Sequence, residues 1–180
     1  LGLGVQDALV RDAAGRLANE RVLDAKAQPQ SSSAYLYDGK GAKVEWRAFD
    51  GSGLLRAVTR YSPGRIDLLD AAGKAAGAIV VESGADGRPL KRSYLAADGS
   101  LQKIELYSYA GGSAAGGAGE PGALETRRAD GSLASRTTYS YGALGELVSS
   151  RTEDGAGAAR ESRRYEYSIR EDTKTETYYE

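Results

Sequence analysis

Apolar and polar residues alternate with a period of two along much of the chain. The clearest stretch is 133–141, in which Leu133, Thr137 and Tyr139 fall on one side and Arg136 falls on the other. Alternation of this kind, rich in Thr, Tyr and Val, is typical of a β-strand with one half-buried face. The pattern therefore predicts a succession of short strands.

Glycine-bearing turns separate these strands. Two forms recur, Asp-x-x-Gly as at Asp12–Gly15 and Ala-Asp-Gly as at Ala85–Gly87. In the first form Asp opens a type I turn, and its carboxylate can accept from the backbone N–H two residues on. In both forms glycine supplies the positive φ that closes a hairpin with a G1 bulge. The glycines expected at this position are Gly15, Gly41, Gly53, Gly73, Gly87, Gly99, Gly131, Gly145 and Gly157.

Turns that recur at short, nearly regular intervals predict an all-β protein. We expect an antiparallel meander of repeated short β-hairpins that forms an extended, twisted sheet or an incomplete barrel. We expect the Gly/Ala-rich stretch 111–123 to be a loop or linker. It separates N-terminal hairpin repeats in 1–110 from C-terminal hairpin repeats in 124–180, and we expect the two sets of repeats to form one continuous sheet. A shorter break is expected at 28–33, and helical patterns are weak because 71–78 contains two glycines.

Composition changes this picture in one respect, the size of the core. Leu, Ile, Val and Phe make up about 17 % of the 180 residues, below the roughly 20 % associated with disordered chains. However, 12 Tyr and one Trp add large, rigid apolar surface, and a net charge of −1 gives no self-repulsion. We therefore expect an ordered protein with a thin core.

Several kinds of chemistry are excluded or disfavoured. The chain has no Cys, His or Met, so it has no disulfide, thiolate nucleophile or imidazole. Acidic pairs such as Glu45 with Asp50 could in principle serve a glycosidase, but nearly every Asp lies in a predicted turn. We therefore expect no enzyme, no catalytic residue, no metal site and no cofactor. Balanced charge argues against nucleic acid as a partner, and no apolar run approaches the ~20 residues of a membrane span.

The aromatic strand faces are the candidate binding sites. The candidate residues are Trp46, Tyr139, Tyr141, Tyr165 and Tyr167. These rings could form a platform for a protein partner or a sugar. They could instead form cross-strand ladders that hold the sheet together, with each pair contributing ~0.2–1 kcal/mol. The second interpretation is favoured, and the two are compatible.

The segments 139–148, 154–157 and 164–167 together resemble the RHS/YD-repeat family. The family pattern is Tyr-x-Tyr-Asp, a short turn ending in Gly, and then Arg or a similar residue and Leu. Residues 35–41 are also similar, whereas Gly142 stands where the family usually has Asp. MORN-like and YwqK-type hairpin repeats share these turns and tyrosines. The resemblance implies long antiparallel ribbons, sometimes closed into shells around a toxin, and it supplies no catalytic residue.

Three functions follow as hypotheses. The first is a non-catalytic structural or binding repeat module of a bacterial envelope or secreted protein, which engages a protein partner by a sheet edge or a Tyr-bearing face. The second is a carbohydrate-binding or carbohydrate-active protein with a Tyr/Trp platform. The third is a fragment of an RHS-type toxin shell. The periplasmic, surface or secreted location follows from the resemblance and from the absence of an initial Met, and the oligomeric state is left open.

Overall fold

The computed structural model describes residues 6–109, 120–142, 145–168 and 173–179, and within these ranges the side chains of residues 8–165. These residues form β-strands and turns. The strands are β1 (Gln6–Arg11), β2 (Leu17–Leu23), β3 (Pro29–Tyr37), β4 (Lys43–Asp50), β5 (Leu55–Ser62), β6 (Arg65–Asp70), β7 (Ala75–Ser83), β8 (Pro89–Ala96), β9 (Leu101–Ser108), β10 (Ala123–Arg128), β11 (Leu133–Tyr141), β12 (Leu147–Asp154), β13 (Ala159–Ser168) and β14 (Thr173–Tyr179). In the described part of the chain, no helix has the length and apolarity that a membrane crossing requires.

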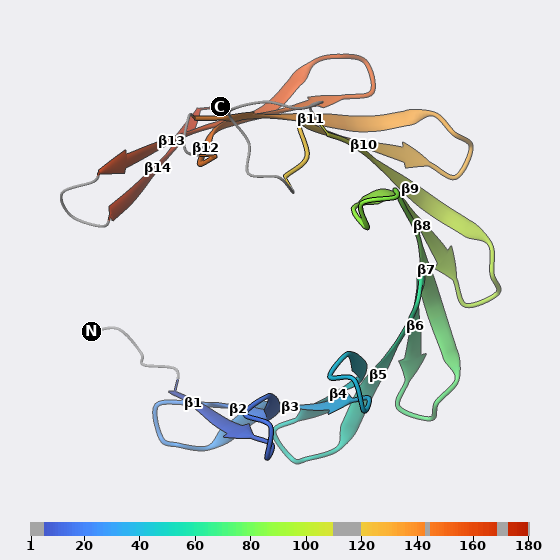
Figure 1. Cartoon of the computed structure of the whole chain (residues 1–180), viewed down its shortest axis with the longest axis vertical. Coiled ribbons are helices and arrows are strands. Elements are labelled where there is room, and N and C mark those ends of the chain that lie inside the picture. Colours follow the sequence, from blue (N-terminus) through green and yellow to red (C-terminus); the bar gives the residue numbers. More distant parts are fainter. Residues whose placement is uncertain (1–5, 110–119, 143–144, 169–172, 180) are drawn as a thin grey trace. The chain divides into compact units, whose positions relative to one another are not determined.

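The strands form one antiparallel sheet in which each strand lies beside its neighbours in sequence (Figure 1). The strand order runs from β1 to β14 without a crossover. The predicted fold class, an all-β meander of short hairpins, is confirmed. One detail of the prediction is wrong, because 29–33 is the start of strand β3 and no break occurs there.

The contacts within the chain divide it into two units. The N-terminal unit consists of 1–80 and 95–100, and the C-terminal unit consists of 81–94 and 101–180. Each unit is described separately below.

Ten of the described hairpins close with the same kind of tight turn. The N–H of its first residue donates to the carbonyl of the fifth, and the N–H of the fourth donates to the carbonyl of the first, as at Asp12–Arg16 and Asp50–Leu54. All nine predicted glycines occupy the fourth position, with φ between +78° and +88°. The sequence prediction of these turns is confirmed, and Gly64 adds a shorter turn between β5 and β6.

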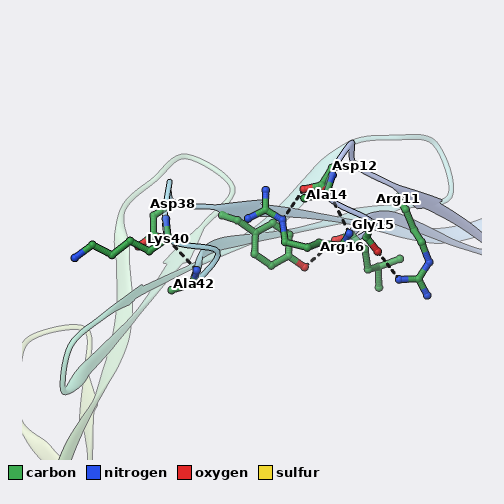
Figure 2. A network of polar contacts seen from close by, with 10 residues as sticks. Arg11, Asp12, Ala14, Gly15, Arg16, Asp38, Lys40 and Ala42 are labelled. Atoms are coloured by element: carbon green, nitrogen blue, oxygen red, sulfur yellow. Dashed lines mark hydrogen bonds and ion pairs between the residues drawn. The ribbon is translucent and has the colours of Figure 1, made fainter.

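Aspartate carboxylates hold the turns together. In the turn at Asp12, the Oδ1 atom accepts from the N–H of Ala14 at 2.9 Å and from the N–H of Arg16 at 3.0 Å. The turn at Asp38 has the same two bonds, as Figure 2 shows. In the Ala-Asp-Gly form, Asp86 accepts from the N–H two residues on, that of Arg88. These bonds replace water as the partner of backbone groups that a hairpin turn leaves unpaired.

The turn carboxylates make the stability of the fold depend on pH. A hydrogen bond from the Ser52 hydroxyl, followed by one from the N–H of Leu54, lowers the pKa of Asp50 to about 2. Because the folded pKa lies below the unfolded value of about 3.9, this stabilisation is present above pH ~4 and is lost as the pH falls towards 2. We expect Asp50→Asn to destabilise the chain at pH 7 and to have little effect at pH 2. Urea unfolding at both values checks this, and an equal loss at both would contradict it.

The turn Asp24–Gln28 departs from the others because a non-glycine residue takes the left-handed position. Ala27 has a φ of +59°, a conformation that costs L-residues about 1–2 kcal/mol. Ala27→Gly relieves this strain but adds freedom to the unfolded chain, so it should raise the free energy of unfolding by up to about 1 kcal/mol.

The matched control for Ala27→Gly is the reverse substitution, glycine to alanine, at the same position of another turn. A Cβ at Gly15 would have no atom within 4 Å, so Gly15→Ala should lower the free energy of unfolding through backbone strain alone. Urea titrations of both variants test the pair. A loss of stability in Ala27→Gly would show that the strain at this position is absent.

Buried side chains are few and lie on both faces of the sheet. Val58 and Thr59 are adjacent in β5, point to opposite faces, and are each 7 % exposed. In the C-terminal unit, Ala123 is 9 % and Tyr165 is 8 % exposed. All described strands belong to one sheet, so the described residues supply no second layer. The expected thin core is what the burial pattern shows.

Candidate functional site

The second tyrosine of three Tyr-x-Tyr pairs donates its hydroxyl to a backbone carbonyl 20 residues earlier in the chain. The pairs are Tyr37 with Leu17 at 2.8 Å, Tyr109 with Pro89 at 2.8 Å and Tyr141 with Pro121 at 2.9 Å. We call this contact a tyrosine lock. Each lock ties the end of one strand to a backbone carbonyl well back along the chain, so these hydroxyls are used in building the sheet.

An arginine covers the ring in the first lock. The guanidinium carbon of Arg16 lies 4.6 Å from the centre of the Tyr37 ring. Its Nε donates to Asp12 Oδ2 at 2.7 Å (Figure 2), so the turn aspartate fixes the orientation of the guanidinium. Its Nη1 lies 3.6 Å from the point at which a Cβ on Gly41 would stand. The guanidinium therefore fills the space between the lock ring and the neighbouring turn.

The second lock repeats this arrangement. The Arg88 guanidinium lies 4.4 Å from the centre of the Tyr109 ring, and its Nε donates to Asp86 Oδ2 at 2.6 Å. In both locks the arginine directly precedes the residue whose carbonyl accepts from the tyrosine, which is Leu17 in the first and Pro89 in the second. Stacking of a cation on a tyrosine face contributes about 0.5–1 kcal/mol at an exposed site.

The third lock has a hollow where the other two have an arginine. Its volume is about 370 Å³, and it is lined by Glu120, Pro121, Tyr139, Tyr141, Gly145 and Leu147. Glu120 directly precedes the acceptor residue Pro121, so it holds the position of the two arginines. Burial, followed by the charge of Glu120, raises the pKa of Tyr141. The hollow thus combines two half-buried tyrosine rings with a carboxylate, and this is the candidate binding site.

A second polar cluster lies at Glu105 in β9. The Glu105 carboxylate accepts from Tyr94 Oη at 2.7 Å, Tyr107 Oη at 2.9 Å and Lys103 Nζ at 2.7 Å. Burial tends to raise the pKa of Glu105, but these three donors outweigh it and hold the pKa below its usual value. Lys103 Nζ also lies 4.0 Å from the centre of the Tyr94 ring. Its acceptor atoms are engaged, so this cluster serves stability.

Of the five residues that the sequence nominated, two lie at the hollow, and the charge of a third, Tyr165, contributes after burial to the raised pKa of Tyr139. Tyr139 and Tyr141 both line the hollow. Trp46 belongs to the N-terminal unit, where it lies opposite Tyr35 and Thr59 in the strand register. Tyr165 is buried, and the side chain of Tyr167 lies outside the described residues. A binding role for these residues stays a prediction.

Sequence reasoning missed the residues that complete the hollow. Glu120, Pro121 and Leu147 line it beside the two tyrosines. The sequence does contain a sign of them. In all three locks, the arginine or glutamate stands the same number of residues before the lock tyrosine. Strand alternation does not show this signal, because it reports only neighbours along one strand. Within the described ranges, no group of three or more acidic side chains is placed to hold a metal ion.

The lock hydroxyls should contribute measurably to stability. Tyr109→Phe removes the bond to Pro89 and keeps the ring beneath Arg88, so we expect a loss of about 1 kcal/mol in the free energy of unfolding. Tyr61→Phe is the control, because the Tyr61 hydroxyl makes no hydrogen bond within the described part of the chain. Urea unfolding measures both, and equal effects would contradict the role of the lock.

Comparisons with known proteins show no family. No family model matches the chain, and no curated protein matches it. The crystal structure of TcdB2-TccC3-Cdc42 is similar over 94 % of this chain and 10 % of that chain, with 12 % identity and a TM-score of 0.35. A porin-like protein from Bacteroides uniformis is similar over 96 % of this chain and 91 % of that chain, with 10 % identity and a TM-score of 0.41. The crystal structure of TarM is similar over 81 % of this chain and 21 % of that chain, with 14 % identity and a TM-score of 0.18. At these values the similarity carries no inference about function.

Proposed function

We propose that the chain is a non-catalytic structural repeat module of a bacterial envelope or secreted protein, and that it binds a protein partner on its tyrosine-bearing face. The observation that carries the proposal is the hollow at the third lock. The equivalent ring faces at Tyr37 and Tyr109 are covered by a side chain of the same chain. A protein side chain is therefore the kind of group that this position accommodates.

The structural part of the proposal is supported by how the polar side chains are used. The turn aspartates accept from turn backbone groups, as Asp12 does, and the lock tyrosines donate to backbone carbonyls, as Tyr37 does. The Tyr-x-Tyr pairs and glycine turns also resemble the RHS/YD-repeat pattern, which supports the assignment to an envelope or secreted repeat protein. Side chains committed to the sheet in this way favour a scaffold over a catalyst.

The edge strand β1 is a second surface that a protein could use. Leu9 is 54 % and Val10 is 56 % exposed, and the two lie on opposite faces because they are adjacent in the strand. In the strand order, β1 has one neighbouring strand among the described residues. An added strand could pair with the edge of β1 that faces away from β2 and lie beside both side chains.

A peptide display library and a glycan array, applied in parallel to the whole chain, test the proposal. We expect the chain to retain peptides, and we expect Tyr139→Ala to lose them while Tyr61→Ala, the matched control, keeps them. Circular dichroism checks that both variants fold. Loss of binding in Val10→Lys with retention in Tyr139→Ala would move the partner to β1. A glycan that binds in the absence of any peptide would favour the carbohydrate hypothesis and overturn this one.

A further inference from the structure

The hollow at the third lock occupies the position that an arginine side chain fills at the first lock. Every residue that lines the hollow has a counterpart in the sequence of the first lock, at the same offset from the lock tyrosine. The counterparts are Arg16 for Glu120, Leu17 for Pro121, Tyr35 for Tyr139, Tyr37 for Tyr141, Gly41 for Gly145 and Lys43 for Leu147. The two sites are therefore versions of one structural unit.

The exchange of Arg16 for Glu120 reverses the charge at this position. At the first lock, the guanidinium lies between the Tyr37 ring and Gly41. At the third lock the corresponding ring and glycine, Tyr141 and Gly145, line open space, and no Lys or Arg is among the described residues that border it. A tyrosine face attracts a cation, and a carboxylate binds a guanidinium in a bidentate manner. The chemistry of the hollow is thus complementary to the group that is missing from it.

We propose that the hollow between Tyr139, Tyr141 and Glu120 binds an arginine side chain of a protein partner, which takes the place that Arg16 takes at the first lock. The guanidinium stacks on the Tyr141 ring and pairs with the Glu120 carboxylate. Pro121 and Leu147 provide apolar surface for the aliphatic stem. This inference rests on the proposed protein-binding function and specifies the chemistry of the partner.

The raised pKa of Tyr141 agrees with this geometry. After burial, the negative charge of Glu120 is the next cause of this raised pKa. A cation between the two groups would interact favourably with both. The first two locks show that the sheet accommodates an arginine in this setting, since Arg16 and Arg88 lie 4.6 Å and 4.4 Å from their ring centres.

Titration of the isotopically labelled full chain with L-arginine amide, followed by NMR, tests the inference. We expect shifts concentrated at Tyr139, Tyr141 and Gly145. L-citrulline amide has a similar shape without the positive charge, and we expect it to bind at least tenfold more weakly. Equal affinity for the two amides, or shifts elsewhere in the chain, would overturn the proposal.

Variants at Glu120 give an independent test of the same site. Glu120→Gln should weaken the binding of arginine amide about tenfold, and Glu120→Arg should abolish it by supplying the missing guanidinium from within. Glu82→Gln, an equal charge change at an exposed residue of the same unit, should leave binding unchanged. If arginine amide does not bind but peptides sensitive to Tyr139→Ala are found, the arginine inference fails and the proposed function stands.

Discussion

Replacing Gly51 with alanine is expected to lower the free energy of unfolding by about 2–3 kcal/mol, the upper range for an overpacked site. Gly51 is the second residue of the turn Asp50–Leu54, and this turn lies against the backbone of Pro29. A Cβ at Gly51 would overlap the Pro29 carbonyl oxygen. The obstacle is a backbone atom, so no side-chain rotation can relieve it. Gly155→Ala should have the same effect, because its Cβ would overlap the Leu133 carbonyl oxygen.

Gly39 provides the matched control for Gly51. It is the second residue of the turn Asp38–Ala42, and a Cβ there would meet no atom within 4 Å. Gly39→Ala should therefore change stability by less than about 0.5 kcal/mol. Urea unfolding, followed by circular dichroism and by Trp46 fluorescence, measures both variants. Similar losses for Gly39→Ala and Gly51→Ala would show that the close approach of the turn to Pro29 is not the cause.

Removal of the Glu105 carboxylate is the second change with a large expected effect. The Glu105 side chain is 13 % exposed and accepts from two tyrosine hydroxyls and from Lys103. Glu105→Ala leaves these donors without their acceptor. Because a hydrogen bond to a charged group contributes about 1.5–3 kcal/mol, we expect a loss of about 2–4 kcal/mol at pH 7.

The pH dependence of this loss is a further check. The folded pKa of Glu105 is lowered, so its charged form stabilises the fold above the unfolded pKa of about 4.3, and this contribution disappears as the pH falls through the folded pKa. Glu82→Ala is the control, since Glu82 is 59 % exposed and pairs only with Lys91 among described residues, a pair worth under about 1 kcal/mol. If Glu105→Ala and Glu82→Ala cost the same, the cluster does not stabilise the sheet.

The turns of this fold were predictable because their chemistry is local. Except at Gly145, the predicted glycines follow an Asp at a short distance, and each takes the positive φ that the turn requires. The turn at Ala27 was missed because it has no glycine. Ala27 itself takes the positive φ, at a cost in backbone strain. The stretch 28–33 was predicted as a break because Gln, Pro and Ser favour loops, but pairing with β2 and β4 makes 29–33 a strand. Tertiary pairing overrides local preference in such cases.

The candidate site was only half predictable. Tyr139 and Tyr141 were nominated from their period of two, which places both on one face of β11. Glu120 was not nominated because it precedes β10 and borders the hollow from outside β11, a relation that strand alternation does not report. Trp46 was nominated as part of the same aromatic platform, and the register places it opposite Tyr35 and Thr59 in the other unit. The constant spacing between Glu120 and Tyr141 identifies the site only when the strand register shows that residues at this spacing lie near each other.

The stability of Glu120→Arg tests most directly the claim that the hollow is a vacated arginine position. An arginine at 120 should stack on Tyr141 as Arg16 stacks on Tyr37, and should raise the free energy of unfolding by about 0.5–1 kcal/mol. That gain corresponds to a rise of about 1–4 °C in melting temperature. Glu82→Arg, the same charge reversal at an exposed site, should give no such rise. A melting temperature that is unchanged or lowered in Glu120→Arg would contradict the account.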